Sequence, residues 1–248
     1  MAPGKGWTGM GFQSVSRTHA GCQRTVNEDA VLCRPDLGLW AVADGMGGHD
    51  AGEFASALVV EMLASCDPGL DLGTRTEAAR RTITEANRRL VAMGRESETA
   101  RTIGTTVVAI VADPGSFACL WAGDSRAYHC RGRMLVQLTR DHSVVQALVD
   151  AGELGPAEAA DHPDSNLVTR AVGAAPQLII DTVTGEIRTG DTLLLASDGL
   201  TRLINRQELL AGLLASDLSV AADELMETCL ARGAPDNVSL VILRAVEG

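Results

Sequence analysis

The stretch that decides the fold is LWAVADGMGG, residues 39–48. Its first half, Leu39 to Ala43, is an apolar run typical of a buried strand, and the run ends at Asp44 beside a glycine. Strand-like runs also end at carboxylates at Glu28-Asp29, Asp124-Ser125, Asp198-Gly199 and Asp236-Asn237. Carboxylates at the ends of buried strands are costly to desolvate and repel one another, unless cations meet them. Hard oxygen ligands favour Mg²⁺ or Mn²⁺ over Zn²⁺, so the pattern predicts a metal-assisted enzyme.

Composition is consistent with this prediction without implying it. The length of 248 residues permits one large or two small domains, and we expect a single domain over residues 1–248. The formal net charge of −11 disfavours nucleic acid and anionic membranes as partners. No apolar stretch reaches the roughly 18 residues of a membrane span, and Met1 to Met10 lacks a secretory apolar region. We therefore expect a cytoplasmic protein, and a monomer.

The cysteines give no sign of a metal or redox motif. They lie at positions 22, 33, 66, 119, 130 and 229, with no C-x-x-C pair. We interpret them as reduced packing residues. A Cys119–Cys130 disulfide across neighbouring strands is geometrically conceivable, but a cytoplasmic location disfavours it.

Hydrophobic periodicity predicts strands in groups, separated by pairs of helices. Strands are expected at 11–18, 29–34, 39–43, 104–112, 117–122, 127–131, 134–138, 178–184, 193–196 and 238–245. Helices are expected at 51–66, 76–93, 144–150, 206–214 and 219–231. The close spacing of the strands between 104 and 138 favours an antiparallel meander, and residues 141–173 are interpreted as a surface flap.

This grouping is not the strict strand-helix alternation of a doubly wound parallel sheet. It favours an α+β fold of two packed antiparallel sheets with helix pairs outside, in α-β-β-α layers. Loops at one edge of such a sandwich can bring Asp44, Asp198 and Asp236 together.

Six motifs in order carry a family resemblance. They are Arg24 to Asp29 (RTVNED), Val42 to His49 (VADGMGGH), Gly104-Thr105-Thr106, Gly123 to Arg126 (GDSR), Ala196 to Gly199 (ASDG) and Asp236-Asn237. Each alone is weak, but the ordered set, spanning nearly the whole chain, resembles the metal-dependent type 2C Ser/Thr protein phosphatases of bacteria. The segments Gly21 to Asp29 and Arg34 to Asp44 are also similar to the phosphatases associated with type VI secretion.

The resemblance implies a centre of two, and up to three, Mn²⁺ or Mg²⁺ ions that hydrolyses phosphoserine and phosphothreonine in proteins. By the family's pattern, Asp44 bridges two ions, Glu28 and the Gly45 carbonyl bind one, and Asp198 and Asp236 bind the other. Asp29 supports the site through metal-bound water, and Asp124 joins Asp198 at a third ion. Two ions about 3.5–4 Å apart can supply hydroxide near neutral pH and orient the phosphoryl group. Arg24 would grip the phosphate with its bidentate guanidinium.

The proton donor to the leaving group is left open by the sequence. Eukaryotic relatives carry a histidine after the Asp-Gly pair, but this chain has Met46, which cannot donate a proton. His49 is a candidate, and metal-bound water is the alternative. For His142 and His162 we expect surface or capping roles.

Several alternatives remain open at this stage. Each Asp-Gly or Asp-Asn pair could be a plain turn, Gly-Asp-Ser at 123–125 could be a hairpin turn, and Arg24 could form a surface ion pair. The protein could also be a catalytically inactive phosphoprotein-binding module or a phosphatase of small phosphomonoesters. We expect phosphorylated proteins as substrates, a cognate Ser/Thr kinase as the opposing enzyme, and an acidic flap that selects basic or flexible peptides.

Overall fold

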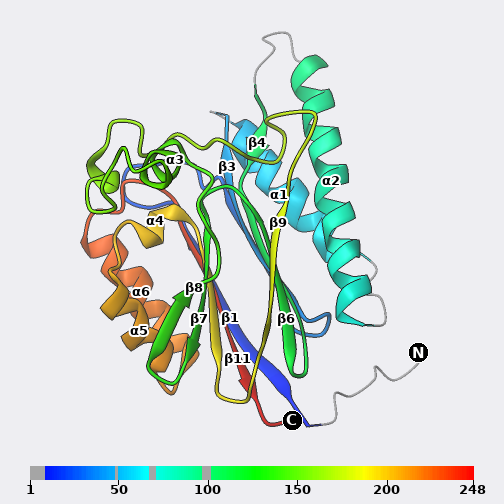
Figure 1. The fold of residues 1–248 in the computed structure, drawn as a ribbon, viewed down its shortest axis with the longest axis vertical. Coiled ribbons are helices and arrows are strands. Elements are labelled where there is room, and N and C mark those ends of the chain that lie inside the picture. Colours follow the sequence, from blue (N-terminus) through cyan, green and yellow to red (C-terminus); the bar gives the residue numbers. More distant parts are fainter. Residues whose placement is uncertain (1–8, 48–49, 67–70, 97–101) are drawn as a thin grey trace.

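The computed structural model describes residues 9–47, 50–66, 71–96 and 102–248. Two antiparallel sheets pack face to face, and a pair of helices lies outside each sheet (Figure 1). The strand order is β1-β11-β10-β7-β8 in one sheet and β2-β3-β5-β6-β9 in the other, where β4 also pairs with β3. The predicted α+β sandwich with α-β-β-α layers is confirmed.

The strands are β1 (Gly11–His19), β2 (Asp29–Arg34), β3 (Leu39–Met46), β4 (Gly104–Thr105), β5 (Val107–Asp113), β6 (Ser116–Ala122), β7 (Arg126–Arg131), β8 (Met134–Gln137), β9 (Asp181–Glu186), β10 (Thr192–Ala196) and β11 (Val238–Val246). The helices are α1 (Asp50–Ala64), α2 (Leu72–Glu96), α3 (Val144–Asp150), α4 (Asp198–Thr201), α5 (Arg206–Leu214) and α6 (Leu218–Ala231), with a 3-10 turn, η1, at Ala159–Asp161. None of these helices is long and apolar enough to cross a membrane, as far as the described residues go.

Three apolar layers explain why the central strands read as continuous hydrophobic runs. In β3, Trp40 and Val42 face the space between the sheets, whereas Ala41 packs toward α1 and α2. In β10, Leu193 faces the space between the sheets and Leu194 packs toward α5 and α6. A strand covered on both faces has no polar side, so its sequence shows no alternation.

The predicted meander between residues 104 and 138 is wrong in two places. The expected strand 104–112 is divided at Thr106, where the Asp44 N–H donates to the side-chain Oγ1 of Thr106 at 3.1 Å, although the Thr106 N–H still donates to the Asp44 carbonyl in the register shared by β4 and β5. The strands β6 and β7 do not pair with each other but belong to different sheets. Residues 123–125 are therefore a crossover between the two layers and not a hairpin turn.

The strand predicted at 178–184 is shifted, because β9 begins only at Asp181. Ile180 is buried against the α1–α2 layer, and its carbonyl accepts a hydrogen bond from Arg80 of α2 at 2.8 Å. Apolar character here marks packing against a helix and not strand pairing. The segment predicted as a flap contains α3 and η1 joined by loops.

The crossover depends on Gly123. Its φ of +122° lies in a region that side chains rarely adopt, and a Cβ at this position would stand 2.5 Å from the Cβ of Thr106. Both the positive φ and the closeness of Thr106, the residue before β5, therefore require glycine at this position.

We expect Gly123→Ala to lower the free energy of unfolding by about 3 kcal/mol, because strained φ and steric overlap add. The matched control is Gly132→Ala in the β7–β8 turn, where φ is +54° and no heavy atom lies within 4 Å of the added Cβ. The control should cost only about 1 kcal/mol. Urea unfolding of both variants measures the difference, and equal costs would contradict the steric role of Gly123.

Candidate metal centre

A cleft of about 440 Å³ collects nearly all of the residues that the sequence singled out. Its lining includes Arg24, Glu28, Asp44, Gly45, Asp124, Asp198 and Asp236. These residues come from the loop before β2, from β3, the β6–β7 crossover, the start of α4 and the loop before β11. Among the predicted ligands, Asp29 does not line the cleft, and it lies 8% exposed as the first residue of β2.

The Thr105-Thr106 pair fixes the backbone of Asp44. The Asp44 carbonyl accepts hydrogen bonds from Thr106 N–H at 2.8 Å and Thr105 Oγ1 at 2.9 Å, and the Asp44 N–H donates to Thr106 Oγ1 at 3.1 Å. Thr106 Oγ1 also lies 2.8 Å from Ser125 Oγ in the crossover. No role could be assigned to Gly104-Thr105-Thr106 from the sequence. In the structure, this motif connects Asp44 to the loop that carries Asp124.

Asn237 fixes Glu28 in the same manner. Its Oδ1 accepts a hydrogen bond from Glu28 N–H at 2.8 Å, while its Nδ2 donates to the carbonyls of Ala20 and Val26, both at 3.0 Å. The carbonyl of Glu28 in turn accepts from Ser56 Oγ of α1 at 2.6 Å. From the sequence, the Asp236-Asn237 pair could also be a plain turn. The pair does not reveal that the Asn237 side chain bonds Ala20, Val26 and Glu28 and so acts as a clamp on this loop.

Gly45 and Gly52 allow β3 to lie against the start of α1. A Cβ on Gly45 would stand 2.2 Å from the Gly52 carbonyl oxygen, and one on Gly52 would stand 2.7 Å from Glu28 Oε1. Gly45 lies within β3 and does not form part of a sharp turn. Its absence of a side chain therefore serves close approach rather than backbone freedom.

Burial and mutual repulsion raise the pKa values of the clustered carboxyl groups. Burial is the larger cause for Asp44, whose pKa rises well above its ordinary value, and the charges of Asp29, Asp198 and Asp124 raise it further. Burial first, and then neighbouring carboxylates, raise the pKa of Asp29 and of Asp124 to about 7 each. Burial raises the pKa of Asp198 too, against the nearby Arg202. Carboxyl groups with raised pKa values lack a compensating positive charge.

Two unsatisfied oxygens make the same point geometrically. Glu28 Oε1 and Asp29 Oδ1 are buried and have no hydrogen-bond partner among the described residues. The other Asp29 oxygen, Oδ2, accepts from Ser197 Oγ at 2.9 Å. Across the same described ranges, no three Asp, Glu, His or Cys side chains converge into a ready ligand group. An all-oxygen donor set with unmet charge fits Mn²⁺ or Mg²⁺.

Arg24 lies on the rim of the cleft. Its Nη2 is 3.1 Å from Asp236 Oδ2, and both side chains are about half exposed. Arg24 therefore does form an ion pair, as the alternative interpretation expected. Its partner, however, is Asp236, which is one of the predicted ligands and also lines the cleft. An exposed pair of this kind contributes little stability, so the guanidinium remains available to another anion.

The histidines differ from expectation. His49 lies outside the described residues, and Met46 lines the cleft. His142 was expected in a surface or capping role. It is buried and stacks on Trp121, and its Nδ1 accepts from the Gly123 N–H while its own backbone N–H donates to the Gly123 carbonyl, both at 3.0 Å. It is a structural support of the crossover. His162 accepts from Asp164 N–H at 3.1 Å in a local turn, as a capping role would require.

Comparison with known proteins gives a consistent result. Residues 18–233 match the family described as Protein phosphatase 2C. The chain is 39% identical over 239 residues to the serine/threonine protein phosphatase PstP of Mycobacterium tuberculosis, covering 94% of this chain and 45% of that protein. The chain thus spans about half the length of this curated relative. It is 35% identical to the serine/threonine phosphatase stp of Listeria monocytogenes, with 92% and 93% covered.

Solved structures give the same picture. This chain superposes on the structure of PppA, described as a key regulatory component of T6SS in Pseudomonas aeruginosa, with a TM-score of 0.87 at 39% identity. The superposition covers 95% of this chain and 99% of that chain. The catalytic domain of PstP in complex with two manganese ions superposes with a TM-score of 0.84 at 35% identity, covering 96% and 99%.

We expect Asp44→Asn to stabilise the protein in EDTA by about 1–2 kcal/mol, because the substitution removes a buried carboxylate that its neighbours repel. The same substitution should abolish most of the stabilisation by Mn²⁺, which for the wild type is about 2.7 kcal/mol at a hundredfold excess over Kd.

Thermal unfolding with EDTA and with Mn²⁺ measures both effects. Glu227→Gln, the same chemical change on an exposed residue of α6, is the control and should alter neither. Equal stabilisation of wild type and Asp44→Asn by Mn²⁺ would show that Asp44 is not a ligand.

Proposed function

The chain belongs to the protein phosphatase 2C family, and on that premise we propose that it hydrolyses phosphoserine and phosphothreonine in proteins with two, and up to three, Mn²⁺ or Mg²⁺ ions. The observation that carries the proposal is the gathering of Arg24 and the predicted ligands around one cleft. Relatives named as serine/threonine phosphatases support it.

The residues proposed to hold the ions are Glu28, Asp44, Gly45, Asp124, Asp198 and Asp236. Asp29, which does not line the cleft, is proposed to support the site through metal-bound water. When bound, two such ions lower the pKa of water and polarise the phosphoryl group, so no protein nucleophile is required. The chain's own contribution is to fix the donors in advance. Thr106 holds Asp44, and Asn237 holds Glu28.

Arg24 is proposed to bind the phosphate of the substrate. Arg24 lines the cleft and forms an ion pair with Asp236, in which both side chains are about half exposed. Its planar guanidinium can form two parallel hydrogen bonds to phosphate oxygens. Exchange of a carboxylate partner for a phosphate would place the substrate directly over the proposed ligands. His49 remains a proposed proton donor to the leaving group, because Met46 cannot act as one.

We propose a cytoplasmic monomer that opposes a cognate Ser/Thr kinase. Cys119, Cys130 and Cys229 are buried as free thiols, which supports a reducing compartment. Similarity to PppA, which is described as a component of type VI secretion, supports a role in that pathway, and genes adjacent to this one would test it. An inactive phosphoprotein-binding module is the less supported alternative, because each acidic position of the predicted set is filled.

With Mn²⁺ or Mg²⁺, we expect the purified protein to hydrolyse a phosphothreonine peptide and to prefer it to a sugar phosphate. Asp44→Asn and Asp198→Asn should each lower kcat by at least a hundredfold, about 2.7 kcal/mol in activation free energy, and EDTA should abolish activity. A preference for the sugar phosphate would favour the phosphomonoesterase alternative. A folded protein that hydrolyses neither substrate with any metal, yet binds the phosphopeptide, would be a binding module.

We expect Arg24→Lys to raise KM for the phosphopeptide about tenfold, because an ammonium group cannot form the bidentate contact. The stabilisation of the variant by Mn²⁺ should remain close to the wild-type value, since Arg24 is not a proposed ligand. Kinetics and thermal unfolding of this one variant check both statements. If KM is unchanged, Arg24 is only the partner of Asp236.

A further inference from the structure

One wall of the cleft is formed by residues 165–168, which follow the outer part of the flap segment. Asn166, Leu167 and Val168 line the cleft directly. The wall is fixed by backbone hydrogen bonds to the start of α3: Leu167 C=O accepts from Val144 N–H at 2.9 Å, and Val168 pairs with Ser143. The Leu167 N–H donates to the carbonyl of Asp164 at 3.0 Å. With both its backbone groups bonded, Leu167 has a defined position.

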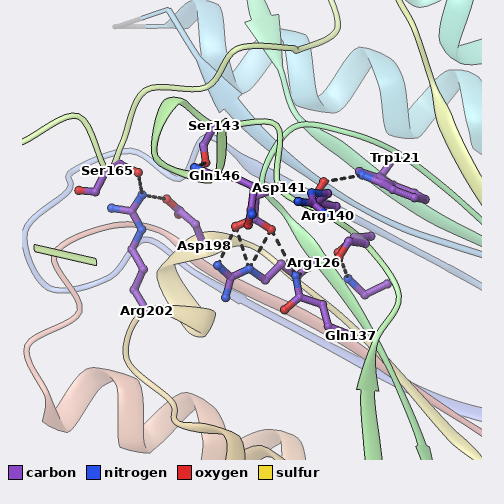
Figure 2. A network of polar contacts seen from close by, with 12 residues as sticks. Trp121, Arg126, Gln137, Arg140, Asp141, Ser143, Gln146, Ser165, Asp198 and Arg202 are labelled. Atoms are coloured by element: carbon purple, nitrogen blue, oxygen red, sulfur yellow. Dashed lines mark hydrogen bonds and ion pairs between the residues drawn. The ribbon is translucent and has the colours of Figure 1, made fainter. Parts of the chain in front are cut away.

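Arg202 fixes the same wall from the other side. Its guanidinium donates to the carbonyl of Ser165 at 3.0 Å and to the side chain of Asn166. It also forms a 3.0 Å ion pair with Asp198, so it lies between the wall and α4, as Figure 2 shows for Ser165 and Asp198. The wall is therefore attached to the segment that supplies a proposed metal ligand.

Leu167 is nevertheless 51% exposed. A single exposed leucine is ordinary on a protein surface. This one differs in being held by hydrogen bonds on both sides of its backbone, in the wall of a cleft that five carboxylates also line. A backbone segment that is fixed before binding loses little conformational entropy when a partner covers its side chain.

We propose that Leu167 is a specificity-determining residue that contacts an apolar side chain next to the phosphorylated residue of the substrate, with Arg202 as the residue that positions it. This inference rests on the proposed phosphatase function. The substrates would be phosphoproteins with leucine, isoleucine, valine or methionine beside the phosphoserine or phosphothreonine.

The position of the acidic groups favours an apolar over a basic neighbour. The carboxylates of the outer flap, Glu153, Glu158 and Asp161, do not line the cleft, and Asp161 borders the adjoining hollow under the flap instead. The wall therefore presents Leu167 to the cleft, and not these three carboxylates. The earlier expectation that an acidic flap selects basic peptides becomes the competing outcome of the test.

The test compares phosphothreonine peptides that are identical except for leucine, serine or lysine beside the phosphothreonine, with phenyl phosphate as a reference substrate. In the wild type, kcat/KM for the leucine peptide should exceed that for the serine peptide about fivefold, because about half of a leucine side chain becomes buried. In Leu167→Ala this ratio should fall to about one. In Arg202→Gln the ratio should also fall. Loss of the Arg202–Asp198 ion pair could lower activity on every peptide equally, but such a uniform loss leaves the ratio unchanged.

Val220→Ala, which truncates an aliphatic side chain that is 50% exposed on α6, is the matched control and should keep the wild-type ratio. A preference for the lysine peptide, or a leucine preference that survives in Leu167→Ala, would overturn the inference while leaving the phosphatase intact. Failure to hydrolyse phenyl phosphate and every peptide would instead overturn the proposed function on which it rests.

Discussion

The carboxylates of Asp44, Asp124, Asp198 and Asp236 repel one another, and the structure around them consists largely of contacts that hold their backbones together against that repulsion. Burial and neighbouring charge raise the pKa values of Asp44 and Asp124, and Glu28 and Asp29 each keep a buried oxygen without a partner. None of this favours folding. It is tolerated because three apolar layers, which the sandwich builds away from the cleft, supply the stability.

The supporting contacts are neutral hydrogen bonds to the backbone, and not counter-charges. Thr106 and Thr105 bond the backbone of Asp44, and Asn237 and Ser56 bond that of Glu28, so these supports do not use the side-chain carboxylates. A positively charged support would have satisfied the carboxylates and competed with a metal ion. Arg24 and Arg202 do pair with Asp236 and Asp198, but the two arginine side chains are 53% and 40% exposed, so solvent weakens the pairs.

Much of the fold and of the site could be predicted from the sequence, because the central strands are covered on both faces and the ligands follow in a recognisable order. The failures have physical causes. In the run 104–112 only residues 107–112 are continuously apolar, and no local pattern shows that the Thr106 side chain accepts the hydrogen bond from the Asp44 N–H. Gly-Asp-Ser has the composition of a turn whether it joins two paired strands or crosses between sheets. Leu178 and Ile180 are apolar because they pack under α2, which a strand pattern cannot distinguish. Asn237, Ser56, Thr106 and His142 act through bonds to residues distant in sequence, and no local pattern encodes such partners.

The Asn237 clamp also has a consequence for the order of events during protein synthesis. Asn237 bonds Ala20, Val26 and Glu28, and β11 pairs along the whole of β1. The loop that carries Arg24 and Glu28 leaves the ribosome first, but its hydrogen bonds to Asn237 cannot form until the segment around Asn237 has followed. Closing so long a loop is slow, and the cleft is among the last parts to form. A nascent chain therefore cannot capture metal ions or dephosphorylate its neighbours before β11 has been translated.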